Sequence, residues 1–234
     1  MLCSIVVPCY NEEKNIPLIF ERFKAAMGGC RADLELLLVN NGSDDGTGER
    51  ISALLSGHPF ARMVVVAVNQ GYGYGILQGL RAAKGGYLGW THADLQTDPG
   101  DVIKAVNIVS EKRGRVFVKG DRKGRPLFDR FFTSGMSWFE TLYLGERLHD
   151  INAQPNIFPA EFFRSWRNPP HDFALDLYAL YMAKKHGLEV VRFDVKFPPR
   201  LHGASSWNTG LTAKWKFIKR TLDFSFVLKK QGIS

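Results

Sequence analysis

The first 90 residues alternate short apolar runs with stretches of helical periodicity. The predicted strands are 3–7, 34–39, 63–68 and 87–90. Strands without polar alternation are buried on both faces, and alternation of such strands with helices is typical of parallel α/β sheets. The sequence therefore predicts an α/β fold with a Rossmann-like, mostly parallel central sheet flanked by helices.

The second half of the chain has a looser pattern. Further helices are predicted at 101–111, 131–144 and 175–186, and further strands at 116–119 and 190–197. The segment 119–130 is rich in Lys, Arg, Gly and Asp, which predicts a mobile loop. No repeat or linker interrupts the sequence, so we expect one domain. Its predicted parts are 1–99, 100–210 and a helix at 211–230.

Composition limits the compartment and the partners. The 234 residues are 45% hydrophobic and 23% charged, as in an ordinary globular protein, and three cysteines indicate neither a disulfide framework nor a zinc site. The start lacks the pattern of a secretory signal, and no apolar run approaches the roughly 20 residues of a membrane-spanning helix. We therefore expect a cytoplasmic protein. The net charge of +8 suits nucleic acid, an anionic membrane or a phosphorylated substrate equally.

Polar loops follow the first two predicted strands, at the edge where such sheets bind ligands. The candidate nucleoside-binding residues in them are Pro8, Tyr10, Asn11, Glu12, Asn40 and Asn41. An aromatic ring can stack on a base, and carboxylates or amides can hydrogen-bond a ribose or a base. Turns and helix caps explain both loops equally well.

The segment after the fourth strand carries alternating polar side chains. In an extended chain His92, Asp94 and Gln96 share one face, while Ala93 and Leu95 point to the core. Carboxylate and amide oxygens with an imidazole suit Mn²⁺ or Mg²⁺, whose shell diphosphate and water would complete. The alternative is a polar loop before a helix, which does not explain the alternation.

Four stretches together resemble the family-2 glycosyltransferases, which have the GT-A fold. The stretches are 4–16, 36–47, 69–99 and 197–207. The most similar subgroup is that of dolichyl-phosphate mannose synthases and bacterial polyprenyl-phosphate sugar transferases. The resemblance implies inverting, metal-dependent transfer of a sugar from a nucleoside diphosphate sugar to a lipid-linked or glycan acceptor. It assigns the donor to residues 1–99 and the acceptor to 100–210.

The resemblance also implies roles for individual residues. Asp94 matches the second acid of the family's metal motif, and Gln96 matches the amide that follows it. Gly71 lies in the resembling stretch of the nucleotide half. Arg200 and Ser206 lie in the C-terminal segment that resembles the family's phosphate-binding Arg-x-x-Gly-x-Ser motif.

The chain departs from the family pattern at two places. Asn40 and Asn41 stand where the family usually has paired acids, and His92 stands where its metal motif begins with Asp. An amide still hydrogen-bonds a base, so the departure leaves the base preference open. His92 either binds the metal, favouring Mn²⁺, or contacts phosphate. A nucleotide-sugar-binding protein without turnover is therefore an alternative function.

The acceptor half offers two candidate catalytic carboxylates, Asp150 and Asp176. A neutral acceptor hydroxyl needs a carboxylate base nearby, whereas an ionised phosphate acceptor needs electrostatic positioning. The family has an acid near Asp150, which favours that residue. Arg122 lies in the predicted loop, where it either closes over the diphosphate or an anionic acceptor or is solvated.

The predicted C-terminal helix at 211–230 has a broad apolar face and a basic face. This pattern fits a helix lying on the anionic inner face of the cytoplasmic membrane. Packing on the domain and pairing across a homodimer are the alternatives. No nucleic-acid-binding motif is present, so we expect no nucleic-acid partner. A soluble or surface-polysaccharide acceptor is the alternative to a lipid-linked one.

Overall fold

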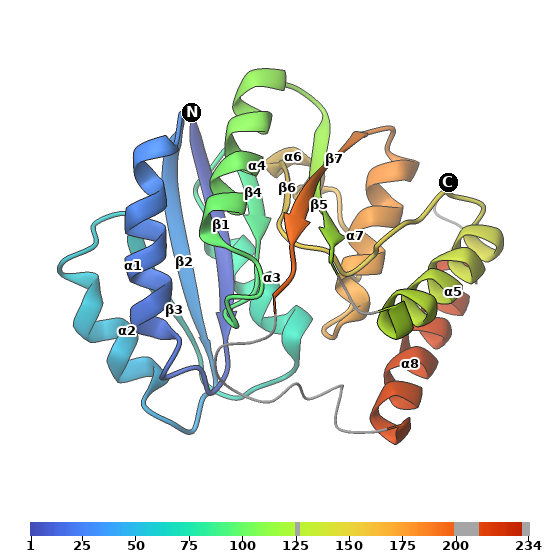
Figure 1. Cartoon of the computed structure of the whole chain (residues 1–234), viewed down its shortest axis with the longest axis horizontal. Coiled ribbons are helices and arrows are strands. Elements are labelled where there is room, and N and C mark those ends of the chain that lie inside the picture. The colour runs from blue at the N-terminus through green and yellow to red at the C-terminus, as the bar shows by residue number, and fades with distance from the viewer. Residues whose placement is uncertain (125–126, 199–210, 231–234) are drawn as a thin grey trace.

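The computed structural model describes residues 1–124, 127–198 and 211–230, without the side chains of 127–134, 136 and 211–218. A seven-stranded sheet with the order β3-β2-β1-β4-β6-β5-β7 forms its centre (Figure 1). The strands are β1 (Leu2–Cys9), β2 (Asp33–Asn41), β3 (Ala61–Val66), β4 (Tyr87–Trp90), β5 (Val116–Lys123), β6 (Asn156–Pro159) and β7 (Glu189–Lys196). Only β6 runs antiparallel to its neighbours β4 and β5, so the predicted mostly parallel sheet is confirmed.

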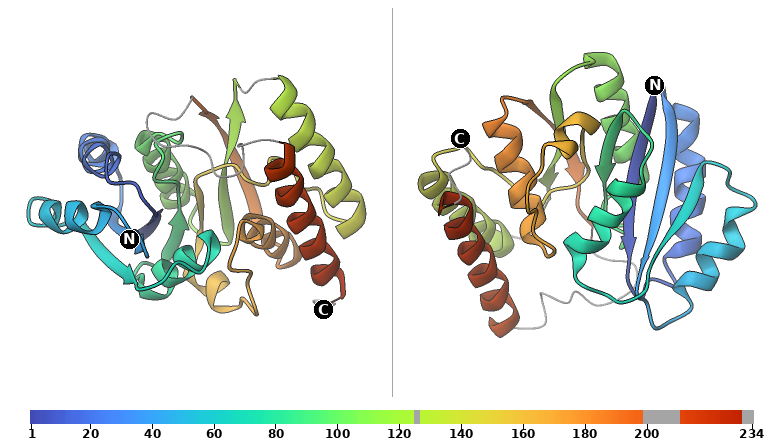
Figure 2. Two further views of the ribbon diagram at one scale, coloured as in Figure 1. Left: turned by 90° about the horizontal axis from the view of Figure 1, so that it is seen from below. Right: turned by 180° about the vertical axis from the view of Figure 1, so that it is seen from behind.

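Helices cover both faces of this sheet (Figures 1 and 2). The helices are α1 (Ile16–Ala26), α2 (Thr47–Leu55), α3 (Tyr72–Ala82), α4 (Pro99–Lys112), α5 (Leu127–Leu144), α6 (Ala160–Arg164), α7 (Ala174–Lys185) and α8 (Leu211–Lys230). A short 3₁₀ turn, Met27–Gly29, follows α1. Helices α1, α2 and α4 contribute to one apolar core, and α3, α6 and α7 contribute to the other.

The strands have this arrangement because their side chains are apolar on both faces. In β1, Ile5 and Val7 join the core under α1 and α4, whereas Val6 joins the core under α3 and α7. All three side chains are fully buried. The continuous apolar runs of the sequence are therefore strands that are buried on both faces of the sheet, as predicted.

Three features differ from the sequence prediction. The segment 119–130 is not one loop, because β5 continues to Lys123 and α5 begins at Leu127. Pairing with β7 keeps the polar end of β5 extended, up to the pair of Lys123 with Lys196. The short elements β6 and α6 were not predicted.

Helices α5 and α8 lie side by side at one edge of the molecule (Figures 1 and 2). The rings of Tyr143 on α5 and Phe226 on α8 meet edge to face, with 5.1 Å between their centroids. Helix α8 has the predicted bounds and packs on α5 and α7. None of the described helices is both long and apolar enough to pass through a membrane.

Candidate active site

Two loops at the carboxyl ends of β1 and β2 are joined by hydrogen bonds. The Asn11 backbone N–H donates to the Ser43 hydroxyl at 3.2 Å, and the Asp44 N–H donates to the Asn11 side-chain oxygen at 3.0 Å. The Glu12 N–H donates to the Thr47 hydroxyl at 2.9 Å. These bonds fix the two predicted nucleoside-binding loops relative to each other.

Tyr10 lies on the rim of the joined loops. Its side chain is 45% exposed, and its hydroxyl lies 3.5 Å from an Asp44 carboxylate oxygen. Pro8 precedes it within β1, paired with Val39 of β2. An exposed aromatic ring on a fixed loop can stack on a flat ligand such as a nucleobase.

The two asparagines at the end of β2 have different surroundings. The Asn40 side-chain oxygen accepts from the Ser43 N–H at 3.2 Å, which shapes the turn after the strand. Asn41 is buried, and its amide donates to the Gly71 carbonyl at 3.1 Å. Gly71 has φ +117°, and a β-carbon there would lie 2.4 Å from the His171 carbonyl oxygen. Asn41 and Gly71 thus hold the turn that begins α3.

Asp94 lies in a tight turn just beyond β4. Its carboxylate accepts from the Gln96 N–H at 3.1 Å, and it is only 5% exposed. Ala93 and Leu95 are buried as predicted, but the φ of +58° at Leu95 makes the segment a turn, so the predicted extended conformation is wrong there. The Gln96 amide donates to the Pro198 carbonyl at 2.9 Å, which links this turn to the segment after β7.

The donor set at this turn suits a hard divalent cation. Within the described part of the chain, no group of three or more His, Cys, Asp or Glu side chains is placed to hold a metal ion. One carboxylate and one amide oxygen are ligands that Mn²⁺ and Mg²⁺ accept, with water and phosphate oxygens as the remaining ligands. Asp94 and Gln96 therefore fit a cation that binds together with a phosphate-bearing ligand.

His92 belongs to a stack of three rings. Its ring lies 5.4 Å from that of Tyr72 with an interplanar angle of 17°, and Tyr72 lies 4.6 Å from Phe173 at 13°. The three residues come from the segment after β4, the first turn of α3 and the residue before α7. The stack therefore holds the His92 ring nearly parallel to the Tyr72 ring.

A buried polar network lies on the same side of the sheet. One carboxylate oxygen of Asp176 accepts from Trp90 Nε1 at 3.3 Å, Gln154 Nε2 at 2.7 Å and Asn156 Nδ2 at 3.1 Å. Lys119 donates to the Asn156 side-chain oxygen at 2.7 Å. Burial raises the pKa of Asp176 and lowers the pKa of Lys119 to about 7. Asp176 therefore faces the protein interior.

Asp150 and Arg122 form an ion pair that is largely buried. The Asp150 carboxylate accepts from the Arg122 backbone N–H at 2.8 Å and from Nε at 3.0 Å, and it also contacts Nη2. The side chains are 1% and 9% exposed. Arg122 thus lies on β5 and not in the predicted loop, and its guanidinium lies 5.1 Å from the centre of the Phe197 ring. The pair stands at the carboxyl end of β5.

The structure brings most of the predicted site residues to this edge of the sheet, on the segments after β1, β2 and β4 and at the end of β5. Arg200 and Ser206 lie outside the described residues. Sequence reasoning missed Tyr72, Phe173 and Lys119. A lysine inside the apolar run Val116–Val118 and Gly120 was the available signal for Lys119, because a buried charge needs partners.

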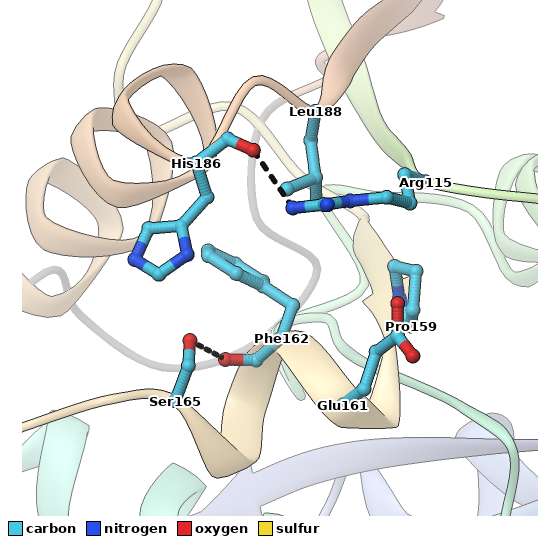
Figure 3. Close-up of a pocket in the computed structure, with 7 residues that line it drawn as sticks. All are labelled: Arg115, Pro159, Glu161, Phe162, Ser165, His186 and Leu188. Atoms are coloured by element: carbon cyan, nitrogen blue, oxygen red, sulfur yellow. Dashed lines mark hydrogen bonds between the residues drawn. The ribbon is translucent and has the colours of Figure 1, made fainter.

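A separate hollow lies at the opposite edge of the sheet, near the starts of β5 and β7 (Figure 3). Its lining residues are Arg115, Pro159, Glu161, Phe162, Ser165, His186 and Leu188. Arg115 donates to the His186 carbonyl at 2.8 Å and Ser165 donates to the Phe162 carbonyl at 2.7 Å. These polar groups thus bond to the backbone, away from the strand ends that carry the candidate site.

Comparison with known proteins adds a family match. The family model described as Glycosyl transferase family 2 matches residues 4–168. Undecaprenyl-phosphate 4-deoxy-4-formamido-L-arabinose transferase of Yersinia enterocolitica is 32% identical over 110 residues, which cover 46% of this chain and 33% of that protein. The Aeromonas hydrophila protein of the same name is 35% identical over 109 residues, covering 45% and 32%. The matched region thus spans about a third of the length of these relatives.

Solved structures share the fold at low sequence identity. Glucosyl-3-phosphoglycerate synthase from Mycobacterium tuberculosis, in complex with phosphoglyceric acid, has a TM-score of 0.75 and 19% identity. That match covers 97% of this chain and 79% of the other. The complex of the same protein with Mn²⁺, uridine diphosphate and glucosyl-3-phosphoglycerate has a TM-score of 0.72 and 20% identity, covering 97% and 78%.

Proposed function

Because the chain belongs to glycosyl transferase family 2 and has the GT-A fold, we propose that it is a metal-dependent, inverting glycosyltransferase. Its donor is a nucleoside diphosphate sugar, and its acceptor is a lipid-linked phosphate or a glycan. The observation that carries the proposal is the position of Asp94. This buried carboxylate accepts from the Gln96 N–H in the turn after β4, a strand that pairs in parallel with β1, so both segments lie at the same edge of the sheet.

Different residues of the site bind different parts of the nucleotide. Tyr10 stacks on the base, and Glu12 and Asn11 lie on the same loop to receive ribose or base hydrogen bonds. Asp94 and Gln96 hold Mn²⁺ or Mg²⁺, which neutralises the charge on the departing diphosphate. Complexes of the structurally similar synthase with uridine diphosphate and either Mn²⁺ or Mg²⁺ support this cofactor assignment.

The acceptor approaches the carboxyl end of β5. The Arg122–Asp150 pair places a guanidinium and a carboxylate there. Arg122 positions an ionised phosphate acceptor, and Asp150, whose side chain is 1% exposed and accepts from the Arg122 N–H groups, holds the guanidinium in place. Direct attack on the anomeric carbon inverts its configuration. Because Asp176 already accepts three N–H groups in the interior, we assign it a positioning role.

A polyprenyl phosphate is the acceptor class that we favour. The names of the two curated relatives specify undecaprenyl phosphate. The described part of α5 exposes Trp138 and Leu142, at 69% and 64%, and α8 exposes Phe226 and Val227. These apolar side chains, together with four exposed basic side chains of α8, suit insertion at an anionic membrane surface. The bases are Lys219, Arg220, Lys229 and Lys230.

A thermal-shift panel followed by a transfer assay tests the donor and the metal. Nucleoside diphosphates and their sugars are screened with Mn²⁺, and the best donor is used to measure transfer or donor hydrolysis. Asp94→Ala is expected to reduce turnover at least 100-fold. Asp98→Ala is the matched control, because Asp98 caps α4 by accepting from the Gly100 N–H at 2.7 Å and pairs with Arg22 at 3.9 Å, which are structural contacts. Wild-type activity in Asp94→Ala would refute the metal assignment, and no shift with any donor would refute the function.

Liposome flotation tests the membrane surface. Trp138→Ser/Leu142→Ser is expected to lose binding to vesicles that contain anionic lipid. Val65→Ser is the matched control, because Val65 is 64% exposed but lies on β3, at the far edge of the sheet. Equal flotation of both variants and the wild type would refute this surface. Turnover with a short-chain polyprenyl phosphate, compared with a soluble acceptor, identifies the acceptor class.

A further inference from the structure

The stack of His92, Tyr72 and Phe173 fixes the His92 ring from outside its own segment. Nearly parallel rings with centroids 4.6 and 5.4 Å apart have the separations at which aromatic pairs attract each other. Tyr72 is the middle ring, so its loss removes the contact on which the His92 orientation depends. Phe173 precedes α7 and supports Tyr72 from the other side.

The middle ring is itself held firmly. Gln154 Nε2 lies 3.5 Å from the Tyr72 hydroxyl and also donates to Asp176 at 2.7 Å. The His171 carbonyl accepts from the Tyr74 N–H at 2.9 Å, which clamps the start of α3 against the segment before α7. Tyr72 therefore contacts the buried polar network through its hydroxyl and the His92 ring through its own ring.

The chemistry of an imidazole at this place differs from that of a carboxylate. A carboxylate only accepts hydrogen bonds and attracts cations, whereas an imidazole offers an N–H donor to an oxygen. Asp94, two residues further on, already supplies a carboxylate for a hard cation. The imidazole N–H beside this carboxylate can therefore donate a hydrogen bond to an oxygen of the nucleoside diphosphate sugar. That oxygen would be one whose charge the cation does not neutralise.

On the basis of the proposed function, we propose that His92 is a donor-binding residue and not a metal ligand, and that Tyr72 is the positioning residue that holds it. His92 donates a hydrogen bond to an oxygen of the nucleoside diphosphate sugar, either on the diphosphate or on the sugar. Tyr72 acts through His92, with Phe173 as its support.

Calorimetric binding of the best nucleoside diphosphate and its sugar, each with Mn²⁺ and with EDTA, tests the proposal. His92→Ala is expected to weaken binding about tenfold under both conditions, as the loss of one hydrogen bond implies. Asp94→Ala is expected to remove only the gain that Mn²⁺ provides. If His92→Ala binds both the nucleoside diphosphate and its sugar more weakly, the contact is to the diphosphate. If it binds only the sugar nucleotide more weakly, the contact is to the sugar. Both results support the proposal.

Variants of the stack separate positioning from general stability. Tyr72→Leu is expected to match His92→Ala, and Tyr72→Phe, which keeps the ring, is expected to bind within about twofold of wild type. Phe173→Leu keeps Tyr72 and is expected to weaken binding about threefold, which retains a test if Tyr72→Leu does not fold. Tyr74→Leu is the matched control, because that ring on the same turn of α3 meets His171 instead.

Four outcomes would overturn the proposal. His92→Ala weakening binding only with Mn²⁺ would make His92 a metal ligand. Folded Tyr72→Leu and Phe173→Leu variants that bind like wild type would remove the positioning role. A wild-type protein that binds no nucleotide would overturn the proposed function and this inference with it, whereas wild-type binding with unaffected variants overturns this inference alone.

Discussion

The buried ion pair between Arg122 and Asp150 allows a quantitative stability prediction. Asp150→Ala leaves the Arg122 guanidinium, whose side chain is 9% exposed, without its counter-ion. The change also removes the acceptor for the Arg122 Nε–H and for the Arg122 backbone N–H. Removal of one partner of a buried pair costs about 3–5 kcal/mol. Each kcal/mol lowers the melting temperature of a domain of this size by about 2–4 °C, so we expect a decrease of about 6–20 °C.

Thermal and urea unfolding monitored by circular dichroism provide the assay. The matched control is Glu189→Ala, which breaks the exposed pair of Glu189 with Lys112 and is expected to cost less than about 1 kcal/mol. Asp150→Asn tolerates the φ of +40° at this position and is expected to cost less than Asp150→Ala. Arg122→Met/Asp150→Asn removes both charges and is expected to be more stable than Arg122→Met alone. Equal costs for Asp150→Ala and Glu189→Ala would refute the reasoning.

Three further predictions concern single positions. Gly71→Ala places a β-carbon against the His171 carbonyl at a residue with positive φ. We expect this change to lower the free energy of unfolding, measured in urea, by about 2–4 kcal/mol. The control Gly86→Ala, whose β-carbon would meet open space, is expected to lower it by less than about 1 kcal/mol. Burial raises the pKa of Glu140 to about 7, so the folded state binds more protons than the unfolded state between about pH 4.5 and 7. Wild type should therefore lose about 1–3 kcal/mol relative to Glu140→Gln as the pH rises from 4.5 to 8, and unchanged relative stability would contradict this. Because burial lowers the pKa of Lys119 to about 7, the unfolded state binds more protons above that pH. Wild type should gain stability relative to Lys119→Met as the pH rises from 7 to 10, and a falling difference would contradict the sign.

Local sequence patterns predicted the parallel part of the fold because its strands are buried on both faces. The apolar runs of β1 and β2 needed no knowledge of their neighbours. β6 has four residues, and its antiparallel place between β4 and β5 depends on tertiary pairing alone. The polar end of β5 has the composition of a loop but is held extended by β7, so pairing overrides local preference there.

The candidate site was predictable where the chain itself positions the residues. Asp94 and Gln96 follow a buried strand, so their location at the sheet edge followed from the sequence. The partners of Arg122 and His92 did not, because Asp150 lies 28 residues from Arg122 and Tyr72 lies on a different element from His92. Roles that depend on such contacts require the fold.

The contact between α5 and α8 also sets an order in time during synthesis. Lys229 donates to the carbonyl of Tyr143, which precedes it by 86 residues, and Ser225 donates to Glu140 across the same contact. At about 5–20 residues per second, the ribosome needs about 4–17 s to add this stretch. In a nascent chain the face of α5 that carries Glu140 and Tyr143 therefore stays uncovered until α8 has been made. The apolar face that we propose to meet the membrane is complete only after α8 has been synthesised.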